Sequence, residues 1–466
     1  MALSSRLVAV VVGPTLAAAR EQIEMAQEYA DLMEIRLDLL DPQALKKVKD
    51  LPRPKPVIFT FRRKSQGGGR DDLSEGERLA LFEQLLVLKP EYCDLETDTE
   101  LSFFDRIKNK YPEMKIIGSF HDLEKIPEKM ESIFEKMQKP HISYYKIAVA
   151  AHSVNDAIYL LGFAKEHKNL TCVGIGPFGT CSRILAPLVG ADFCYASIEE
   201  GADGLGRLDL KTLCEVYHFK SKARKNIYAL LGDPVEKSIG HLFHNKSFPK
   251  DSIYIKLHLA IPELTRFFSV MRKLPFKGFS VTMPLKEQLD RYLTRIDSVA
   301  AVIGSVNTIV AEEAHLIGYN TDGIGAAGAL LRHCKSIKGL NVVILGAGGS
   351  ARAIAYELIE RGASVVVLNR SIERAEALAN AFGCKAGRME ELKDQKYDVL
   401  INTIPADLLF APDLLIPKAM VMDIVYWEPE TPLLKLAKER GCHCINGLEV
   451  FEEQALAQQK IWFRNQ

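Results

Sequence analysis

One lysine has the most informative surroundings in the sequence. Lys146 stands in YYKIAV between Tyr145 and Ile147, in a run that is apolar on both faces. A strand lysine there must point into a polar cavity or lose its hydration. Burial and nearby cations lower a lysine pKa, and the neutral amine can attack a carbonyl carbon. His121 in GSFHD can take a proton next to the resulting iminium, so the pair predicts Schiff-base chemistry.

Four further charged residues follow other short apolar runs. They are Glu34 and Arg36 in MEIRLDL, Arg62 in FTFR, and Arg183 in GTCSRILAPLVG. Guanidinium groups bind carboxylates bidentately, so Arg62 and Arg183 are candidates for holding a substrate carboxylate. Each residue also has a structural alternative. A strand lysine can reach the rim, a lone histidine can be structural, and Glu34 can pair with Arg36 on one strand face.

The elements that position these residues recur eight times in the first ~220 residues. Short apolar runs alternate with helix-like segments such as 17–30 and 75–88, which predicts a closed (β/α)8 TIM barrel. The predicted strands are 7–12, 33–37, 57–61, 92–96, 115–120, 144–149, 172–175 and 192–197. Because barrel enzymes place their chemistry at the carboxyl ends of the strands, these charged residues should meet at one end.

These strings resemble type I 3-dehydroquinate dehydratase over about 210 residues, in the order EIRLDLL, FTFRRKSQGG, GSFHD, YYKIAV and GTCSRILAPLVG. The resemblance implies Lys146 as the Schiff-base lysine and His121 as the general acid and base. It also implies that Glu34 and Arg36 orient substrate and histidine, and that Arg62 and Arg183 bind substrate.

The sequence departs from this family at two places. The loop over the substrate usually carries a glutamine, but here it reads Ala202-Asp203-Gly204-Leu205. Gln66 stands where a glutamate is common. The lid contacts therefore differ from those of the family.

A second candidate site begins with a glycine-rich turn. The turn follows the predicted strand 342–345, opens a helix and has the pattern GxGxxA, which lets a helix N-terminus approach a pyrophosphate. Its residues are Gly346, Ala347, Gly348, Gly349, Ser350 and Ala351. The next predicted strand, 364–368, ends in Asn369-Arg370-Ser371, with Arg374 one turn on. Guanidinium groups in place of an acidic residue favour the 2′-phosphate, so the predicted cofactor is NADPH rather than NADH.

A lysine and a carboxylate precede this turn. Lys286 follows a strand-like segment, and Asp322 lies in GYNTDG. Such a pair can move the proton that accompanies hydride transfer to a ketone. Taken alone, Asp322 is as readily a helix N-cap, and Lys286 a solvated helix start.

Residues 227–466 resemble shikimate dehydrogenase through YALLGDPVEKSIGHLFHN, GFSVTMPLK, DIVYWEPETPLL and GLEVFEEQALAQQ. The resemblance implies that Lys286 and Asp322 are catalytic and that the glycine-rich turn, Asn369, Arg370 and Arg374 bind the cofactor. The implied substrate contacts are Ser238, Thr282, Asn307, Tyr426 and Gln454. Gly240 and Ser280 replace a serine and an asparagine of the family, which bears on the choice between shikimate and quinate.

Composition narrows the class of partner and the compartment. Lys plus Arg and Asp plus Glu number 60 each, which gives no reason to expect nucleic acid or a membrane. The nine cysteines are scattered apart from Cys442 and Cys444, so reduced thiols and no metal are expected. The apolar run near the N-terminus is too short for a signal peptide, and the cytoplasm is expected. A plastid protein lacking its transit peptide stays open, and the oligomeric state is not predicted.

The predicted organisation is a fusion. Residues 1–222 form the dehydratase barrel, 227–330 a substrate-binding domain completed by 447–466, and 335–446 an NADP-binding Rossmann domain. Dehydration of 3-dehydroquinate gives 3-dehydroshikimate, which the second half would reduce to shikimate. Three alternatives remain: a quinate-directed dehydrogenase, a sensor that has lost catalysis, and an aldolase-type lyase in the barrel.

Overall fold

A computed structural model of the chain describes residues 5–199, 205–221, 224–312, 315–404, 411–428 and 430–464. The chain divides into two compact units, of which the second begins at Tyr228. Phe248–Leu259 and Glu263–Pro275 count with the first unit. Residues 222 and 223, at the predicted boundary between the barrel and the substrate-binding domain, lie outside the described residues.

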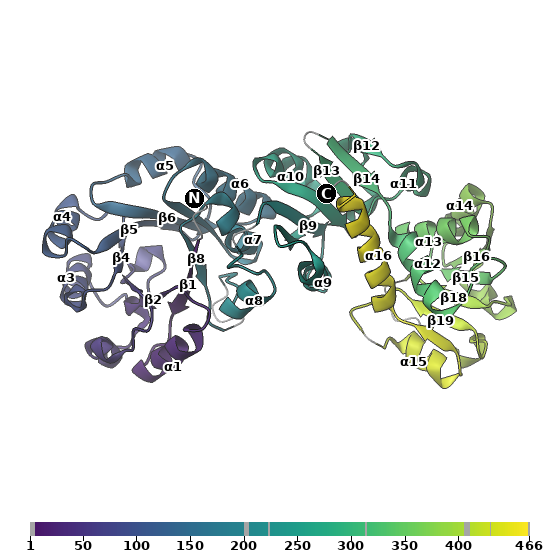
Figure 1. Cartoon of the computed structure of the whole chain (residues 1–466), viewed down its shortest axis with the longest axis horizontal. Helices are drawn as coiled ribbons and strands as arrows, with labels where there is room; N and C mark the ends of the chain where they lie inside the picture. The colour runs from purple at the N-terminus through teal and green to yellow at the C-terminus, as the bar shows by residue number, and fades with distance from the viewer. Residues whose placement is uncertain are drawn as a thin grey trace. The chain divides into compact units, whose positions relative to one another are not determined.

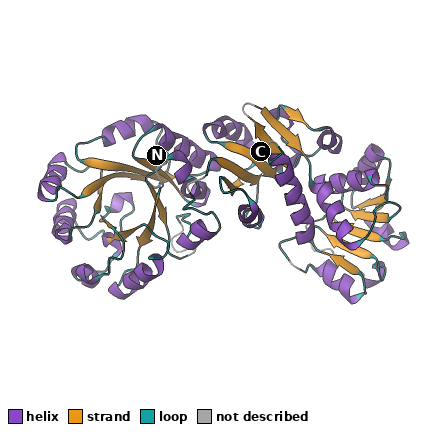
Figure 2. Ribbon diagram, in the orientation of Figure 1, coloured by secondary structure: helices purple, strands orange, loops and turns teal. Residues whose placement is uncertain are grey.

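The first unit contains a ring of eight parallel strands inside a layer of helices (Figures 1 and 2). Its strands are β1 (Arg6–Val11), β2 (Leu32–Arg36), β3 (Val57–Thr60), β4 (Tyr92–Glu96), β5 (Lys115–Asp122), β6 (Ile142–Ala150), β7 (Leu170–Ile175) and β8 (Phe193–Ala196). Its helices are α1 (Leu16–Ala26), α2 (Pro42–Lys46), α3 (Glu75–Leu85), α4 (Leu101–Lys110), α5 (Met130–Met137), α6 (Val154–Glu166), α7 (Thr180–Ile184) and α8 (Leu210–Glu215). The predicted TIM barrel is confirmed, and all eight predicted strands are present.

The ring is closed less completely than predicted. The strand order is β7-β6-β5-β4-β3-β2-β1-β8, with no backbone ladder between β7 and β8 in the described part of the chain. Between these two strands, the backbone N–H of Phe193 in β8 donates to the side-chain hydroxyl of Thr171 in β7 at 3.2 Å and not to a backbone carbonyl oxygen. The barrel is therefore nearly closed.

The barrel interior below the strand ends is apolar. Inward-facing side chains from all eight strands form one buried cluster, which is the packed layer expected of a (β/α)8 barrel. The cluster includes Val8, Val10, Leu32, Ile58, Tyr92, Ile117, Ala148, Val173, Phe193 and Tyr195. Polar side chains share the inward faces of these strands, since Glu34, Thr60 and Ser119 each stand two residues beyond a member of the cluster.

The chain after the barrel forms two further sheets. The first is mixed, with strand order β10-β9-β11-β13-β14-β12. Its strands are β9 (Asn226–Gly232), β10 (Ser252–His258), β11 (Phe276–Val281), β12 (Arg295–Ile296), β13 (Thr308–Glu312) and β14 (His315–Tyr319), with helices α9 (Gly240–Ser247), α10 (Leu264–Val270) and α11 (Ser298–Ile303).

The last sheet is parallel and doubly wound. Its order β17-β16-β15-β18-β19-β20 reverses at β15, which is the arrangement that binds dinucleotides at the carboxyl ends of the strands. Its strands are β15 (Asn341–Leu345), β16 (Ser364–Asn369), β17 (Lys385–Arg388), β18 (Val399–Asn402), β19 (Met420–Asp423) and β20 (His443–Ile445). The helices are α12 (Asp322–His333), α13 (Gly349–Glu360), α14 (Ile372–Phe382) and α15 (Pro432–Glu439). The predicted Rossmann fold is confirmed.

The C-terminal helix α16 (Gly447–Trp462) returns from the doubly wound sheet to the mixed sheet. A capping box between Asn446 and Glu449 fixes its start. Near its end, Trp462 Nε1 donates to the carbonyl oxygen of Ile309 in β13 at 3.0 Å. No helix in the described ranges is both long and apolar enough to cross a lipid bilayer.

Candidate active sites

Lys146 lies inside the barrel with 4% of its surface exposed. Its Nζ atom is 3.2 Å from Glu34 Oε1 and 3.3 Å from Asp94 Oδ2. The same atom lies 3.8 Å from the centroid of the Tyr195 ring. The lysine thus points inward among two carboxylates and an aromatic face, not outward to the rim.

The surroundings of Lys146 favour the neutral form of its amine more than bulk water does. Burial lowers the pKa of Lys146, although the carboxylates of Glu34 and Asp94 oppose that change. Arg62 lowers the lysine pKa further. Burial raises the pKa of Glu34, but attraction to Lys146 and the nearby arginines outweighs it and lowers the value to about 2. Glu34 is therefore a carboxylate at any physiological pH.

His121 lies on β5 beside the lysine strand, in a register that pairs it with Ala148, two residues beyond Lys146. Gln66 Oε1 accepts the backbone N–H of His121 at 3.0 Å and lies 3.2 Å from its Nδ1. Since an amide oxygen only accepts, Nδ1 carries the proton and Nε2 keeps a lone pair. Nε2 is buried and has no hydrogen-bond partner among the described residues. Burial, with the positive charges of Arg62 and Lys146, lowers the His121 pKa well below its ordinary value.

The three arginines predicted for this site have different surroundings. Arg62 lies 3.8 Å from Glu34, and its buried Nε has no hydrogen-bond partner in the described chain. Arg36 forms a bidentate pair with Asp38 at 2.7 and 2.9 Å, which replaces the expected alternative of a pair with Glu34. Arg183, in α7, donates to the backbone oxygens of Gly174 at 2.8 Å and Leu205 at 3.3 Å.

Sequence reasoning missed two members of this cavity. Asp94 of β4 accepts from Ser119 Oγ at 2.5 Å and contacts Lys146, while Tyr195 of β8 supplies the ring beneath the amine. A charged residue in the apolar run 92–96 is the same signal that identified Lys146, so Asp94 was detectable. Tyr195 was not, because an aromatic residue is ordinary in a strand. Of the predicted lid loop, residues 202–204 lie outside the described residues.

The second unit brings Lys286 and Asp322 into a hydrogen-bonded ion pair. Lys286 lies in the single turn Leu285–Glu287 after β11, and Asp322 is the first residue of α12, next to its N-cap Thr321. Asn307 Nδ2 donates to Asp322 Oδ1 at 2.6 Å, which fixes the carboxylate. The side chains keep 19% and 12% of their surface exposed, so small molecules can reach the pair.

Other predicted substrate contacts gather around this pair. Gln454 of α16 donates to Thr321 Oγ1 at 3.3 Å, and Asn307 donates to the same oxygen at 3.0 Å. Tyr426 is hydrogen-bonded to Ser238 and lies close enough to Asp322 for its pKa to rise; burial is the larger cause of that rise. Thr282 follows β11 and packs its methyl group where a Cβ on Gly232 would lie.

Helix α16 also supports Asn307 from behind. Gln458 Nε2 donates to the Asn307 carbonyl oxygen at 3.1 Å and to Thr308 Oγ1 at 2.9 Å. Ser280 Oγ donates to Gln458 Oε1 at 2.8 Å, so this serine is tied to the helix. Gln458 was not predicted, because nothing in the local sequence distinguishes it from a surface glutamine.

The glycine-rich turn has the geometry needed for close approach of a dinucleotide. Gly346 directly follows β15 and has a φ of +106°, and a side chain there would meet Thr403 Oγ1 at 2.5 Å. Gly348 is the N-cap of α13, and nothing lies within 4 Å of an added Cβ. Gly349 begins the helix, while Ala347 and Ser350 are half-buried. The helix N-terminus is thus open toward an anion.

The residues after β16 carry positive charge at the surface. Asn369 Nδ2 donates to the Ser371 carbonyl oxygen at 2.9 Å, and Arg370 and Arg374 are exposed. Strand register places Arg388, at the end of β17, opposite Asn369. Arg388 is a third guanidinium that sequence reasoning missed, since it lies on a different strand. The Ser371 hydroxyl itself donates to Glu373 at 2.6 Å.

Metal-binding groups are not gathered in the described parts of the chain, where no set of three or more His, Cys, Asp or Glu side chains could hold an ion. Cys442 and Cys444 are free thiols that flank His443 in β20. The residues present in both sites are suited to organic substrates and, at the glycine-rich turn, to a dinucleotide.

Three family models match successive parts of the chain: type I 3-dehydroquinase over residues 7–224, the shikimate dehydrogenase substrate binding domain over 230–309, and shikimate / quinate 5-dehydrogenase over 329–434. The shikimate biosynthesis protein AroDE of Chlamydia pneumoniae is 34% identical over 98% of this chain and 95% of its own length. The chloroplastic bifunctional 3-dehydroquinate dehydratase/shikimate dehydrogenase of Arabidopsis thaliana is 31% identical over 93% of this chain and 77% of its own. Shikimate dehydrogenase (NADP(+)) of Pyrococcus furiosus is 39% identical over 51% of this chain and 89% of its own. This chain belongs to the family of bifunctional shikimate-pathway enzymes that join a type I 3-dehydroquinate dehydratase to a shikimate dehydrogenase.

Proposed function

We propose that Lys146 forms the Schiff base in the dehydratase reaction and that Lys286 and Asp322 move the proton in the reductase reaction. The observation that carries the first assignment is the buried Lys146 amine between Glu34 and Asp94, close to a histidine whose Nε2 has no hydrogen-bond partner in the described residues. The substrate of the barrel is 3-dehydroquinate, its product is 3-dehydroshikimate, and the second half reduces that product to shikimate.

In the barrel, the neutral Lys146 amine adds to the ketone carbon of 3-dehydroquinate, and loss of water gives an iminium. The iminium draws electrons from the adjacent C–H bond, and His121 Nε2 accepts that proton. The hydroxyl one carbon further leaves as water with a proton returned by His121, and hydrolysis of the iminium releases 3-dehydroshikimate. Arg62, Arg183 and Arg36 bind or orient the substrate carboxylate and hydroxyls, and Glu34 stays ionised beside the amine.

In the second unit, NADPH supplies the hydride when bound at the glycine-rich turn. The turn from Gly346 to Ser350 would receive its pyrophosphate, and Arg370, Arg374 and Asn369 its 2′-phosphate and ribose. Lys286 donates the proton that the ketone oxygen of 3-dehydroshikimate gains, and Asp322 holds that lysine in place. Ser238, Thr282, Asn307, Tyr426 and Gln454 line the substrate position.

The predicted domain limits, 1–222, 227–330 with 447–466, and 335–446, are retained in this proposal. We place the enzyme in the cytoplasm, because its nine cysteines are free thiols, as is usual for proteins of reducing compartments. No nucleic-acid or membrane partner is included. Cell fractionation with an antibody tests the location, and recovery in an organelle fraction would contradict it.

Borohydride trapping tests the Schiff base. Wild-type chain incubated with 3-dehydroquinate and borohydride should gain one covalently bound product, located by peptide mass spectrometry at Lys146. Lys146→Ala should gain none while still reducing 3-dehydroshikimate with NADPH. An unmodified wild-type chain, or a label on another lysine, would contradict the assignment.

A coupled assay tests the pairing of the two activities. Addition of 3-dehydroquinate and NADPH to the wild-type chain should lower the cofactor absorbance without any added enzyme. The same assay run in reverse with shikimate or quinate and NADP+ tests substrate choice, and faster oxidation of quinate would contradict the assignment of shikimate.

A further inference from the structure

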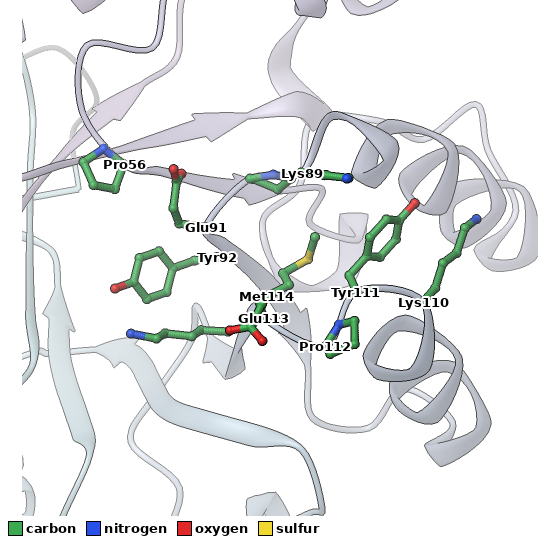
Figure 3. A pocket seen from close by; sticks show the side chains of 11 residues that line it. Pro56, Lys89, Glu91, Tyr92, Lys110, Tyr111, Pro112, Glu113 and Met114 are labelled. Atoms are coloured by element: carbon green, nitrogen blue, oxygen red, sulfur yellow. The ribbon is translucent and has the colours of Figure 1, made fainter.

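A pocket of about 440 Å³ lies in the first unit, and none of the residues that line it is a predicted active-site residue. Figure 3 shows its lining side chains. The pocket is formed where Pro56, Glu91 and Lys115 stand at the amino ends of β3, β4 and β5, next to the last residues of α4. His121 lies near the carboxyl end of β5 and Lys146 at the middle of β6, whereas this pocket lies at the amino ends of the strands.

The pocket combines an apolar wall with positive charge. Its apolar surface comes from Pro56, Pro90, Tyr92, Tyr111, Pro112 and Met114, which suits a flat ring. Three lysines also line it: Lys89, Lys110 and Lys115. Lys115 Nζ lies 5.6 Å from the Tyr92 ring centroid, and Lys110 Nζ lies 5.5 Å from that of Tyr111.

The acidic residues of the pocket, Glu91 and Glu113, form no ion pair with its lysines in the described part of the chain. Glu91 Oε2 accepts the backbone N–H of Val57 at 2.8 Å, which occupies it in holding β3. Lys110 is paired with Glu83 at 3.6 Å, outside the pocket lining. No ion pair involves Lys89 or Lys115 within the described residues. Lys89 and Lys115 therefore stay unpaired in the described residues and can bind an anionic group of a ligand, although Glu91 and Glu113 also line the pocket.

One polar group in the lining lacks a partner. Tyr111 is 9% exposed, and its buried hydroxyl has no hydrogen-bond partner in the described part of the chain. A buried tyrosine hydroxyl normally has one, so its position in a pocket wall points to a ligand atom. Hydrogen bonds hold the surrounding loop in place. Lys108 donates to the carbonyl oxygens of Pro112 and Met114, and the backbone N–H of Met114 donates to the backbone carbonyl oxygen of Tyr111.

We propose that this pocket binds a small aromatic carboxylate. The ring packs against the prolines and Tyr92, the carboxylate faces Lys89 and Lys115, and the Tyr111 hydroxyl donates to a carboxylate oxygen. This site is separate from both catalytic sites and takes a ligand that neither reaction consumes.

Calorimetric titration of the full chain with 2-naphthoate tests the proposal, with both catalytic sites saturated by shikimate and 3-dehydroshikimate. We expect one saturable site. Tyr111→Phe should weaken its affinity about tenfold, since it removes a hydrogen bond to a charged group. Lys89→Gln with Lys115→Gln should weaken it further and remove most of its salt dependence. Lys136→Gln, an exposed lysine of α5, is the matched control and should have no effect.

Three related probes define the ligand class. The neutral 2-naphthamide tests the charge, cyclohexanecarboxylate tests the flat ring, and inorganic phosphate tests for a general anion site. All should bind at least tenfold more weakly than 2-naphthoate. The proposal fails if 2-naphthoate shows no saturable binding, if Tyr111→Phe and the double lysine variant bind it like wild type, or if phosphate binds equally well. Tyr111→Phe should keep both enzymatic activities, which shows that the variant is folded.

Discussion

The two halves of this enzyme each place a lysine beside a carboxylate, but they bury the two lysines to different extents. Lys146 has 5% of its side chain exposed and lies between Glu34 and Asp94, whereas Lys286 has 19% exposed and is paired with Asp322. The first lysine extends from the middle of the barrel strand β6; the second extends from the single turn that follows β11.

This difference in burial suits the two roles that we propose for the lysine side chains. Removal of water from around Lys146 favours the neutral amine, which is a nucleophile. Lys286 remains accessible and is paired with Asp322, which suits the proposed proton donor to a ketone. In this proposal, burial, more than the identity of the neighbouring group, separates the lysine that forms a covalent bond from the one that transfers a proton.

The largest expected effect separates the two lysines directly. Lys146→Met should lower dehydratase kcat by about 10⁴-fold or more, since no other group can form the iminium. Lys286→Met should lower reductase kcat by about 10²- to 10⁴-fold, the usual contribution of proton transfer. Each variant should keep the other activity, measured by separate assays with 3-dehydroquinate and 3-dehydroshikimate. Loss of both activities in a folded variant would show that the two sites are not independent.

The next effect concerns cofactor choice. Arg370→Ala and Arg374→Ala should each raise the KM for NADPH roughly 10- to 100-fold, as loss of a hydrogen bond to a charged phosphate does. The KM for NADH should stay constant, because NADH lacks the 2′-phosphate. Steady-state kinetics with both cofactors provides the measurement. Equal changes for the two cofactors would place these arginines elsewhere than at the phosphate.

A third prediction concerns the pH dependence of the barrel. The pKa of His121 lies well below 6.5 because burial and positive neighbours disfavour its charged form. The imidazole therefore stays neutral as pH falls through 6.5 and becomes protonated only well below it. Gln66→Glu would place a carboxylate next to Nδ1 and raise that pKa by about 1 unit or more. Titration of the His121 imidazole resonances by NMR measures the change.

The dehydratase activity of Gln66→Glu tests whether His121 acts as the base. The acid limb of dehydratase kcat/KM should move to higher pH in Gln66→Glu, while the pH profile of the reductase should not change.

The lowered pKa of His121 also has an effect on stability. Because His121 binds protons more weakly in the folded state, its neutral form contributes stability above pH 6.5, and this contribution is lost as pH falls toward its folded pKa. An unchanged His121 titration in the variant would argue against the Gln66 contact.

The smallest effect concerns the support of the second site. Gln458→Ala removes hydrogen bonds to Ser280, Asn307 and Thr308 and should lower the unfolding free energy by about 1–3 kcal/mol. It should also lower reductase kcat/KM, because Asn307 positions Asp322. Denaturant unfolding with Lys460→Ala, an exposed neighbour on α16, serves as the control. Equal stability of the two variants would contradict the supporting role of Gln458.

The sequence alone determined the barrel and the doubly wound fold, and it supplied the residues of both proposed catalytic pairs, because each depends on a short local pattern. A lysine in an apolar strand, or a glycine-rich turn between a strand and a helix, can be interpreted from the neighbouring residues alone. The tertiary structure decided the partners. Asp94 beside Lys146, Asp38 beside Arg36, Gln458 behind Asn307 and Arg388 near Asn369 all come from other elements. Such contacts depend on strand register and helix packing, which no local spacing specifies.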